Sequence, residues 1–154
     1  MTDLFHTTPY DEAYPACERT LAELRIYPDL ASPQSVTAHL GIEPTSLQTA
    51  GEALRNSLHR TRLTKLNGWF LSSEQHCRSR DIRHHLDWLL EKLLPARDAL
   101  ISLQQWPKVK MGIYCIWWSA SGGGGPVLWP QQMRGMADLN LECGFDISFY
   151  GDDD

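Results

Sequence analysis

The last fifth of the chain carries the pattern that most constrains its fold. Apolar side chains alternate there with polar or small ones as far as Ser148, the apolar set being Leu141, Cys143, Phe145, Ile147 and Phe149. Alternation with a period of two is typical of a strand that buries one face. A short segment that is opened by Pro130 and ends at Asn140 precedes it and has the pattern of a helix. The end of this chain therefore predicts a helix followed by a strand that packs Phe145 into a core.

A similar order of residues occurs near the N-terminus. Residues 33–43 and 130–142 each contain a proline, an apolar anchor, a leucine, a residue suited to the left-handed conformation, an apolar residue and a glutamate. The left-handed residues are Gly41 and Asn140, which stand where a helix ends and a bulky side chain is disfavoured. The repeat predicts a chain built from two strand-helix-strand halves.

Three further strands and one long helix complete the pattern. Alternation predicts strands at 22–26, 69–73 and 109–117. A leucine-rich stripe predicts a helix over 80–105, with a kink or break at Pro95 because proline cannot donate to the helical ladder.

Together these elements predict an α+β fold. The expected architecture is a ferredoxin-like, mainly antiparallel four-stranded sheet, in which the long helix is an insertion between the two halves. We expect an irregular arm at 1–17, a single α+β domain at 18–151 and an acidic tail at 152–154. A chain of 154 residues is long enough for one substantial core.

The charge and composition narrow the partners and the location of the protein. The formal net charge of −5 disfavours nucleic acids and favours a basic partner. Nothing in the sequence is typical of a signal peptide or of the run of ~18 apolar residues that spans a membrane. Four widely spaced cysteines fit free thiols in a reducing compartment, so we expect a soluble cytoplasmic protein. Basic residues concentrate in one segment, at Arg55, His59, Arg60, Arg62 and Lys65.

Four short motifs, in their order and spacing, resemble a known bacterial family. They are GIEPT at 41–45, NGWFLSSE at 67–74, HLDWLL at 85–90 and FDISFY at 145–150. The family that they resemble is Domain of Unknown Function 4279, and the resemblance extends over most of the chain after the N-terminal arm. It implies a small bacterial cytosolic protein. Because no activity or catalytic residue is established for that family, the resemblance assigns no site residue.

One set of polar residues suggests a metal site. His84, Asp87 and Glu91 lie on the helix face opposite the leucine stripe, at a spacing that places them near one another. An ordinary solvated helix face produces the same pattern, and no metalloprotease motif accompanies it. We therefore expect no metal and no other cofactor.

A second set suggests a nucleophile. Cys77 or Ser73 could be activated by His84 or His85, which are near in sequence. No recognisable nucleophile motif surrounds either residue, so we expect no catalytic centre.

Four consecutive glycines at 122–125 suggest a phosphate-binding loop. Such a loop requires Lys and Ser or Thr after its last glycine, whereas Pro126 follows here. A flexible connector is the expected function of this segment.

The predicted strands leave one sheet face rich in large apolar side chains. If one face packs on the helices, the other carries Tyr27, Phe70, Tyr114, Ile116, Trp118 and Tyr150. Soluble monomers seldom expose such a patch. The inserted helix, a second copy of the chain, or a ligand or partner could cover it.

The candidate binding residues are Phe70, Tyr114, Trp118 and Tyr150. We expect a non-catalytic interaction protein that binds a protein partner or itself, in the manner of an immunity or inhibitor protein that neutralises a bacterial toxin. The alternative is a small-molecule-binding protein or an enzyme that uses a cleft beside the glycine-rich loop.

Overall fold

A computed structural model describes residues 7–51, 53–55, 61–63 and 66–151, with side chains for 7–51 and 66–151. The concentration of basic residues at 55–65 and the acidic tail at 152–154 lie outside the side chains described.

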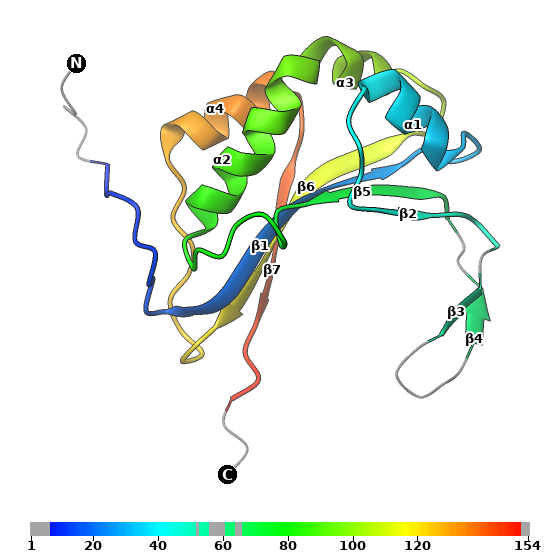
Figure 1. The fold of residues 1–154 in the computed structure, drawn as a ribbon. Helices are drawn as coiled ribbons and strands as arrows, with labels where there is room; N and C mark the ends of the chain where they lie inside the picture. The colour runs from blue at the N-terminus through cyan, green and yellow to red at the C-terminus, as the bar shows by residue number, and fades with distance from the viewer. Residues whose placement is uncertain (1–6, 52, 56–60, 64–65, 152–154) are drawn as a thin grey trace.

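The centre of the fold is one twisted five-stranded sheet with the strand order β2-β5-β1-β6-β7 (Figure 1). Neighbouring strands in this sheet are antiparallel, except for β6 and β7, which are parallel. The strands are β1 (Cys17–Tyr27), β2 (Ser46–Gln48), β5 (Gly68–Ser72), β6 (Lys110–Ser119) and β7 (Cys143–Ser148). A separate two-stranded ribbon joins β3 (Ala53–Arg55) to β4 (Thr61–Leu63). The α+β class is confirmed, but the sheet is mixed and has five strands, and it does not show a ferredoxin-like topology.

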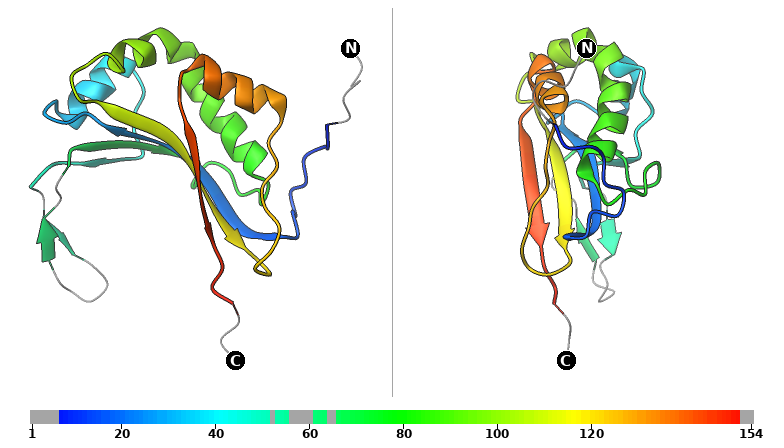
Figure 2. Two further views of the ribbon diagram at one scale, coloured as in Figure 1. Left: turned by 180° about the vertical axis from the view of Figure 1, so that it is seen from behind. Right: turned by 90° about the vertical axis from the view of Figure 1, so that its left-hand side faces the viewer.

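The helices all lie on one face of this sheet, as Figures 1 and 2 show. They are α1 (Pro33–Leu40), α2 (Ile82–Leu93), α3 (Arg97–Leu103) and α4 (Pro130–Asp138), with a single 3-10 turn, η1 (Leu94–Ala96), between α2 and α3. The buried stripe of α2 packs on β1, which forms the core together with apolar residues of β5, β6, α1 and α3. None of the helices in the described part of the chain is both long and apolar enough to cross a membrane.

The expected break at Pro95 is confirmed. The α2 helix ends at Leu93, and Pro95 lies in the 3-10 turn that leads into α3. The region 80–105 is therefore two helices and a turn, because the proline has no N–H for the ladder and its ring crowds the preceding turn.

The two halves correspond, though not through the strands that the sequence suggested. The left-handed conformations at Gly41 and Asn140 are confirmed, with φ of 69° and 55°. Gly41 leads into β2 and Asn140 into β7, so the counterpart of β7 is the short edge strand β2 and not β5. Since β5 is antiparallel to both β1 and β2, β1 and β2 run in the same direction, as β6 and β7 do. The strand β5, which the sequence predicts at 69–73, lies between β1 and β2, and the fifth strand is the short β2, which the sequence does not predict.

Phe145 is not a core residue, contrary to the sequence prediction. Leu141 is buried and Cys143 is partly buried, but the side chains of Phe145, Ile147 and Phe149 are 44%, 53% and 53% exposed. Their alternation is that of a strand, as predicted, with register partners Cys115 for Phe145 and Trp117 for Ile147. The helices cover only the beginning of β7, because α4 packs against α2 and not over the outer end of this edge strand.

Leu86 provides a test of the core. It is fully buried in α2, whereas Leu94, one residue past the end of the same helix, is 39% exposed. We expect Leu86→Ala to lower the free energy of unfolding by about 2–5 kcal/mol, because it leaves a cavity between α2 and the sheet. Leu94→Ala is the matched control and should cost less than half as much. Urea unfolding of both variants measures the difference, and equal losses would contradict this packing.

Candidate binding face and groove

The sheet face turned away from the helices is open. Its residues come from alternate positions of β1, β5 and β6, and the register places Arg19 opposite Trp118 and Arg25 opposite Gly112. One of the sequence-based explanations required the inserted helix to cover the aromatic residues. The helices α2 and α3 cover the opposite face of the sheet, so they do not cover these residues. The aromatic face is therefore surface in the described structure.

The aromatic rings on this face lie flat over glycines. A Cβ atom added to Gly68 would come within 2.5 Å of the Phe70 ring, and one added to Gly144 would come within 3.0 Å of the Tyr114 ring. Gly112 also lies under Tyr114, at 3.2 Å by the same measure. Larger residues at these positions would force the rings upright, so the three glycines make the face smooth.

Arginine side chains lie on top of two of the rings. The Arg25 guanidinium is 4.6 Å from the centre of the Tyr114 ring, and that of Arg19 is 4.8 Å from the centre of the Trp118 ring. Such cation–π contacts contribute about 0.5–1 kcal/mol each at exposed sites. Each arginine is also paired with a carboxylate, Arg25 with Glu23 and Arg19 with Glu74. The face is therefore amphipathic and electrically balanced.

Three of the four predicted binding residues share this face. Phe70 lies in β5, in edge-to-face contact with Tyr27 at 5.8 Å, while Tyr114 and Trp118 lie in β6. Tyr150 lies beyond the end of β7 and is 78% exposed, so β7 does not hold it in the face. Sequence reasoning missed the two arginines and the glycines, because their roles depend on the register between β1 and β6.

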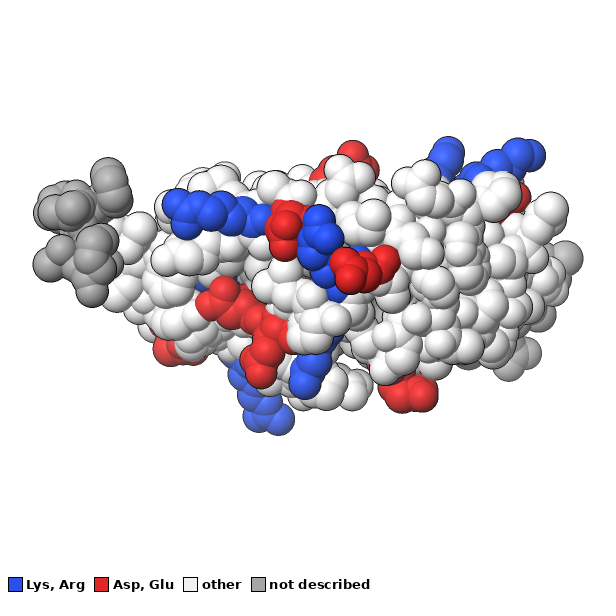
Figure 3. Space-filling model, turned by 90° about the horizontal axis from the view of Figure 1, so that it is seen from above, with Lys and Arg blue, Asp and Glu red and all other residues white. Residues whose placement is uncertain are grey.

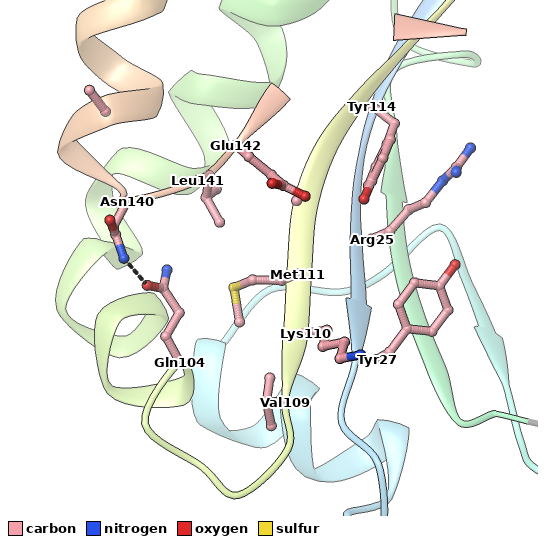
Figure 4. Close-up of a pocket in the computed structure, with 12 residues that line it drawn as sticks. Arg25, Tyr27, Gln104, Val109, Lys110, Met111, Tyr114, Asn140, Leu141 and Glu142 are labelled. Carbon is pink, nitrogen blue, oxygen red and sulfur yellow. Dashed lines mark hydrogen bonds between the residues drawn. The ribbon is translucent and has the colours of Figure 1, made fainter. Parts of the chain in front are cut away.

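A groove of about 810 Å³ begins beside Tyr114 and wraps around the start of β6 (Figure 4). It exists because β7 first pairs with β6 at Ile113, which leaves residues 110–112 without a neighbouring strand on that side. Arg25, Tyr27 and Tyr114 reach it from the open face. The helix side contributes Gln104, Met111, Asn140 and Leu141, of which Asn140 donates a hydrogen bond to Gln104 at 2.9 Å.

The lining of the groove suits a polar, extended ligand. Lys110 and Arg25 supply cations and Glu142 supplies a carboxylate, with apolar surface from Met111 and Leu141 between them. Of the residues that the structure describes, no Ser, Thr, Cys or His side chain lines it. The groove lies at the start of β6, whereas the glycine-rich loop follows the end of β6, so it is not the cleft that the sequence-based alternative placed beside that loop.

The structure brings Ser73 and His85 together, but as a buried structural pair. The Ser73 hydroxyl lies 2.7 Å from Nδ1 of His85, and Nε2 of His85 lies 2.7 Å from the Ser79 carbonyl oxygen, to which it donates. The Ser73 oxygen also accepts the Ala22 N–H at 2.9 Å. Both side chains are buried, and burial lowers the pKa of His85, which keeps the ring neutral. With every polar atom bonded and no access for a substrate, the pair joins β1, β5 and α2.

A buried ion pair lies next to it at the start of α2. Asp81 caps the helix by accepting the Arg83 N–H, and the Arg83 side chain donates to the same carboxylate, with its Nη2 2.6 Å from Oδ2. Burial by itself would raise the pKa of Asp81, but the hydrogen bonds from Arg83 and from the Asp11 N–H outweigh it and lower the pKa.

The same arginine holds the N-terminal arm. Its remaining N–H groups donate to the carbonyl oxygens of Thr8 and Pro9, at 3.0 and 2.9 Å. The Trp129 ring lies over the guanidinium at 5.0 Å and donates its own N–H to Thr8. Residues 7–16 have no regular secondary structure, yet they have a defined path along α2 and α4.

Two of the three candidate metal ligands, His84 and Asp87, have partners within the protein, and the third, Glu91, is exposed. The Asp87 carboxylate accepts hydrogen bonds from Gln132 and Tyr10, and Nδ1 of His84 is 2.5 Å from the Glu12 carboxylate. Among the described residues, no group of three or more His, Cys, Asp or Glu side chains is arranged to hold a metal ion. Asp87 and His84 attach the arm to α2, through Tyr10 and Glu12.

The thiol of Cys77 is not activated. Burial raises its pKa, with a smaller opposing effect from a hydrogen bond that the main-chain N–H of Ser79 donates to the sulfur. The protonated thiol is a weak nucleophile, so the structure gives no support to a catalytic cysteine.

The glycine-rich loop has a specific packing function. Gly124 has a φ of 79°, and a Cβ there would lie 2.7 Å from Ala16 and 3.7 Å from the Trp117 ring. The following carbonyl, of Gly125, accepts the Tyr14 hydroxyl at 2.7 Å. The sequence predicts only a flexible connector, whereas in the structure Gly124 and Gly125 pack against the arm next to Trp117.

Charges on the helix side are mixed. Figure 3 shows Lys and Arg side chains next to Asp and Glu side chains, without a large area of one sign. This surface has no field that would attract a polyanion.

The fold and the site together define a mixed-sheet α+β protein with one bare aromatic face. The chain belongs to the family described as Domain of unknown function (DUF4279), which it matches over residues 16–150. This confirms the resemblance that the sequence motifs indicated. No curated protein and no solved structure matches the chain.

Two adjacent tryptophans test which face is open. Trp117 is fully buried on the helix side, and Trp118 is half-buried on the aromatic face. We expect Trp117→Ala to lower the free energy of unfolding by about 3–5 kcal/mol and Trp118→Ala by about 1–2 kcal/mol, because the second removes a partly solvated ring and one cation–π contact. Urea unfolding of the pair measures this, and the reverse order would mean that β6 faces the other way.

The lowered pKa values of the buried residues His85 and Asp81 predict how the stability of the fold depends on pH. The unfolded chain binds a proton at His85 more readily than the folded protein does, so the free energy of unfolding should fall as the pH drops below about 6.5. The stabilisation from Asp81 is present above its unfolded pKa of about 3.9 and is lost as the pH falls through its lower folded value.

Urea midpoints from pH 8 to pH 3 separate these contributions. His85→Gln should flatten the decline that begins below about pH 6.5, and Asp81→Asn should flatten the decline that begins below about pH 3.9. A His85→Gln protein that keeps the full slope in the upper range would show that His85 titrates normally.

Proposed function

We propose that this protein is a non-catalytic binding protein whose open sheet face contacts a protein partner. The observation that carries the proposal is the composition of the face. It combines Tyr114, Trp118 and Phe70 with Arg19 and Arg25, and Tyr, Trp and Arg are the residue types enriched in the energetic centres of protein interfaces.

The groove gives this face a place for an extended segment or a long side chain of the partner. Tyr27, Tyr114 and Arg25 belong both to the face and to the lining of the groove, so one ligand can contact both. The Met111 peptide groups lie on the unpaired side of β6, since Ile113 two residues later donates to Glu142 on that side. A partner segment could therefore form main-chain hydrogen bonds there.

The charge of the chain favours a basic protein partner over a nucleic acid. The net charge is −5, and the two arginines of the face are neutralised by Glu23 and Glu74. A phosphate backbone would have to displace those carboxylates. An immunity or inhibitor protein that occupies a basic bacterial toxin fits these properties. A cytoplasmic location fits the four unpaired cysteines.

Identification of the partner and two face variants test the proposal. The tagged protein is cross-linked in its source cells, and the recovered partner is purified and titrated against the wild type by calorimetry. We expect Tyr114→Ala and Trp118→Ala each to weaken binding about 30-fold or more, the loss typical of a central interface residue. Leu30→Ala is the control, because Leu30 is 93% exposed in the loop between β1 and α1 and does not belong to the face.

Growth assays test the inhibitor part of the proposal. Expression of the partner alone should arrest growth, co-expression of the wild type should restore it, and co-expression of Trp118→Ala should fail to do so. A partner that binds both face variants as tightly as the wild type would contradict the proposed surface. A harmless partner would contradict the immunity role but leave the binding face intact.

A further inference from the structure

The two edges of the sheet differ in a way that bears on self-association. The edge strand β2 has only three residues, Ser46–Gln48. The edge strand β7 has six, Cys143–Ser148, and contains no proline and no lysine. Short strands, prolines and lysines are the usual devices that prevent an edge from pairing with another chain. The β2 edge is protected from pairing because the strand is short. The β7 edge has only one charged residue, Asp146.

The outer main-chain groups of β7 are placed to pair with another strand. The Ile113 N–H donates to the Glu142 carbonyl at 2.9 Å, so the even-numbered peptide groups of this segment face β6. Because the direction alternates along a strand, the N–H and C=O groups of Cys143, Phe145 and Ile147 point away from the sheet. β7 is the last strand in the sheet order, and Figure 2 shows it at the outer edge.

Apolar side chains accompany these free groups. Phe145 and Ile147 are 44% and 53% exposed on the helix side of β7, beyond the cover of α4. An exposed edge with large apolar side chains is a surface on which another strand gains both main-chain hydrogen bonds and burial.

We propose that two copies of the chain pair through β7, antiparallel, about a two-fold axis at Phe145. In this register Phe145 lies opposite its own copy, Cys143 opposite Ile147, and Gly144 opposite Asp146. All the large side chains at the contact are apolar, and each carboxylate faces a glycine. The two sheets then form one continuous sheet through a closed, self-complementary contact.

The charge of Asp146 selects this register. A two-fold axis at Asp146 would place two carboxylates directly opposite each other, and like charges in opposed positions destabilise a strand pair. An axis at Ile147 avoids that clash but places Phe145 opposite Phe149, which lies after the end of β7 and packs over Gly122. The axis at Phe145 uses only residues within the strand.

This contact is independent of the proposed binding face. It uses the edge of β7, whereas Arg19, Arg25, Tyr114 and Trp118 lie in β1 and β6 on the open face. A dimer would therefore still carry two open faces, and the two proposals fail on different measurements.

Light scattering over a range of concentrations tests the pairing. We expect the wild type to approach twice the mass of the 17.5 kDa chain, and Phe145→Lys to remain a monomer to concentrations at least 30-fold higher. Ile147→Pro should have the same effect, because it removes an outward N–H without breaking the ladder to β6. Leu30→Lys, which also adds a lysine at an exposed leucine, should dimerise as the wild type does.

Cysteine cross-linking tests the register. In a Cys77→Ser, Cys143→Ser background, Phe145→Cys should form an intermolecular disulfide on mild oxidation, because directly opposed residues of a hydrogen-bonded antiparallel pair lie about 5.5 Å apart at Cα. Ile147→Cys should not cross-link in the same background. Thermal unfolding confirms that each variant is folded.

Two outcomes would overturn the proposal. A wild type that stays monomeric at millimolar concentration would show that a second copy does not occupy this edge. A dimer that persists in both Phe145→Lys and Ile147→Pro, or that cross-links through Ile147→Cys and not through Phe145→Cys, would place the contact elsewhere or in another register.

Discussion

The buried ion pair between Asp81 and Arg83 determines how the helical layer sits on the sheet. Asp81 fixes the first turn of α2, and the neighbouring His85 and Ser73 connect that turn to β5 and β1. Once the start of α2 is fixed, its apolar stripe packs in the core against β1. A buried pair of this kind is a weak source of net stability, because the cost of removing both charges from water offsets most of their attraction. Its main contribution here is orientation, since loss of either partner leaves an uncompensated charge in the core.

With all helices on one side, the sheet has two faces of opposite character within the same strands. Trp117 and Trp118 are consecutive residues of β6, yet one lies under the glycine-rich loop and the other beside Arg19 on open surface. Glycines at 68, 112 and 144 let the aromatic rings lie down, so the open face covers its own backbone with a thin layer of rings and guanidinium groups. This arrangement is stable without a helix above it and still offers the residue types that bind proteins.

Local patterns predicted the elements well and their partners poorly. Caps and breaks depend on the chemistry of single residues, which is why Gly41, Pro95 and Asn140 could be placed from sequence. The sequence also shows the alternation of β7, but an alternating pattern cannot show whether a helix extends over that part of the sheet, and so the sequence predicts Phe145 in the core. The sequence could not predict which strands pair, or in which register, for a similar reason. The direction of β5 depends on the chain between β2 and β5, and the contact of Arg25 with Tyr114 requires the register of β1 against β6.

The way in which Arg83 holds the arm has a consequence for how this protein can change. Its guanidinium contacts the peptide oxygens of Thr8 and Pro9, which every amino acid possesses, and also the Thr8 hydroxyl, while the Trp129 indole contacts the same Thr8 peptide oxygen. The attachment therefore recognises the path of the chain more than the identity of its residues. Sequences that share α2 and Trp129 can therefore differ at residues 8 and 9 and still keep the main-chain hydrogen bonds that hold the arm. The arm can in this way acquire a new surface for a new partner while the core beneath it stays the same.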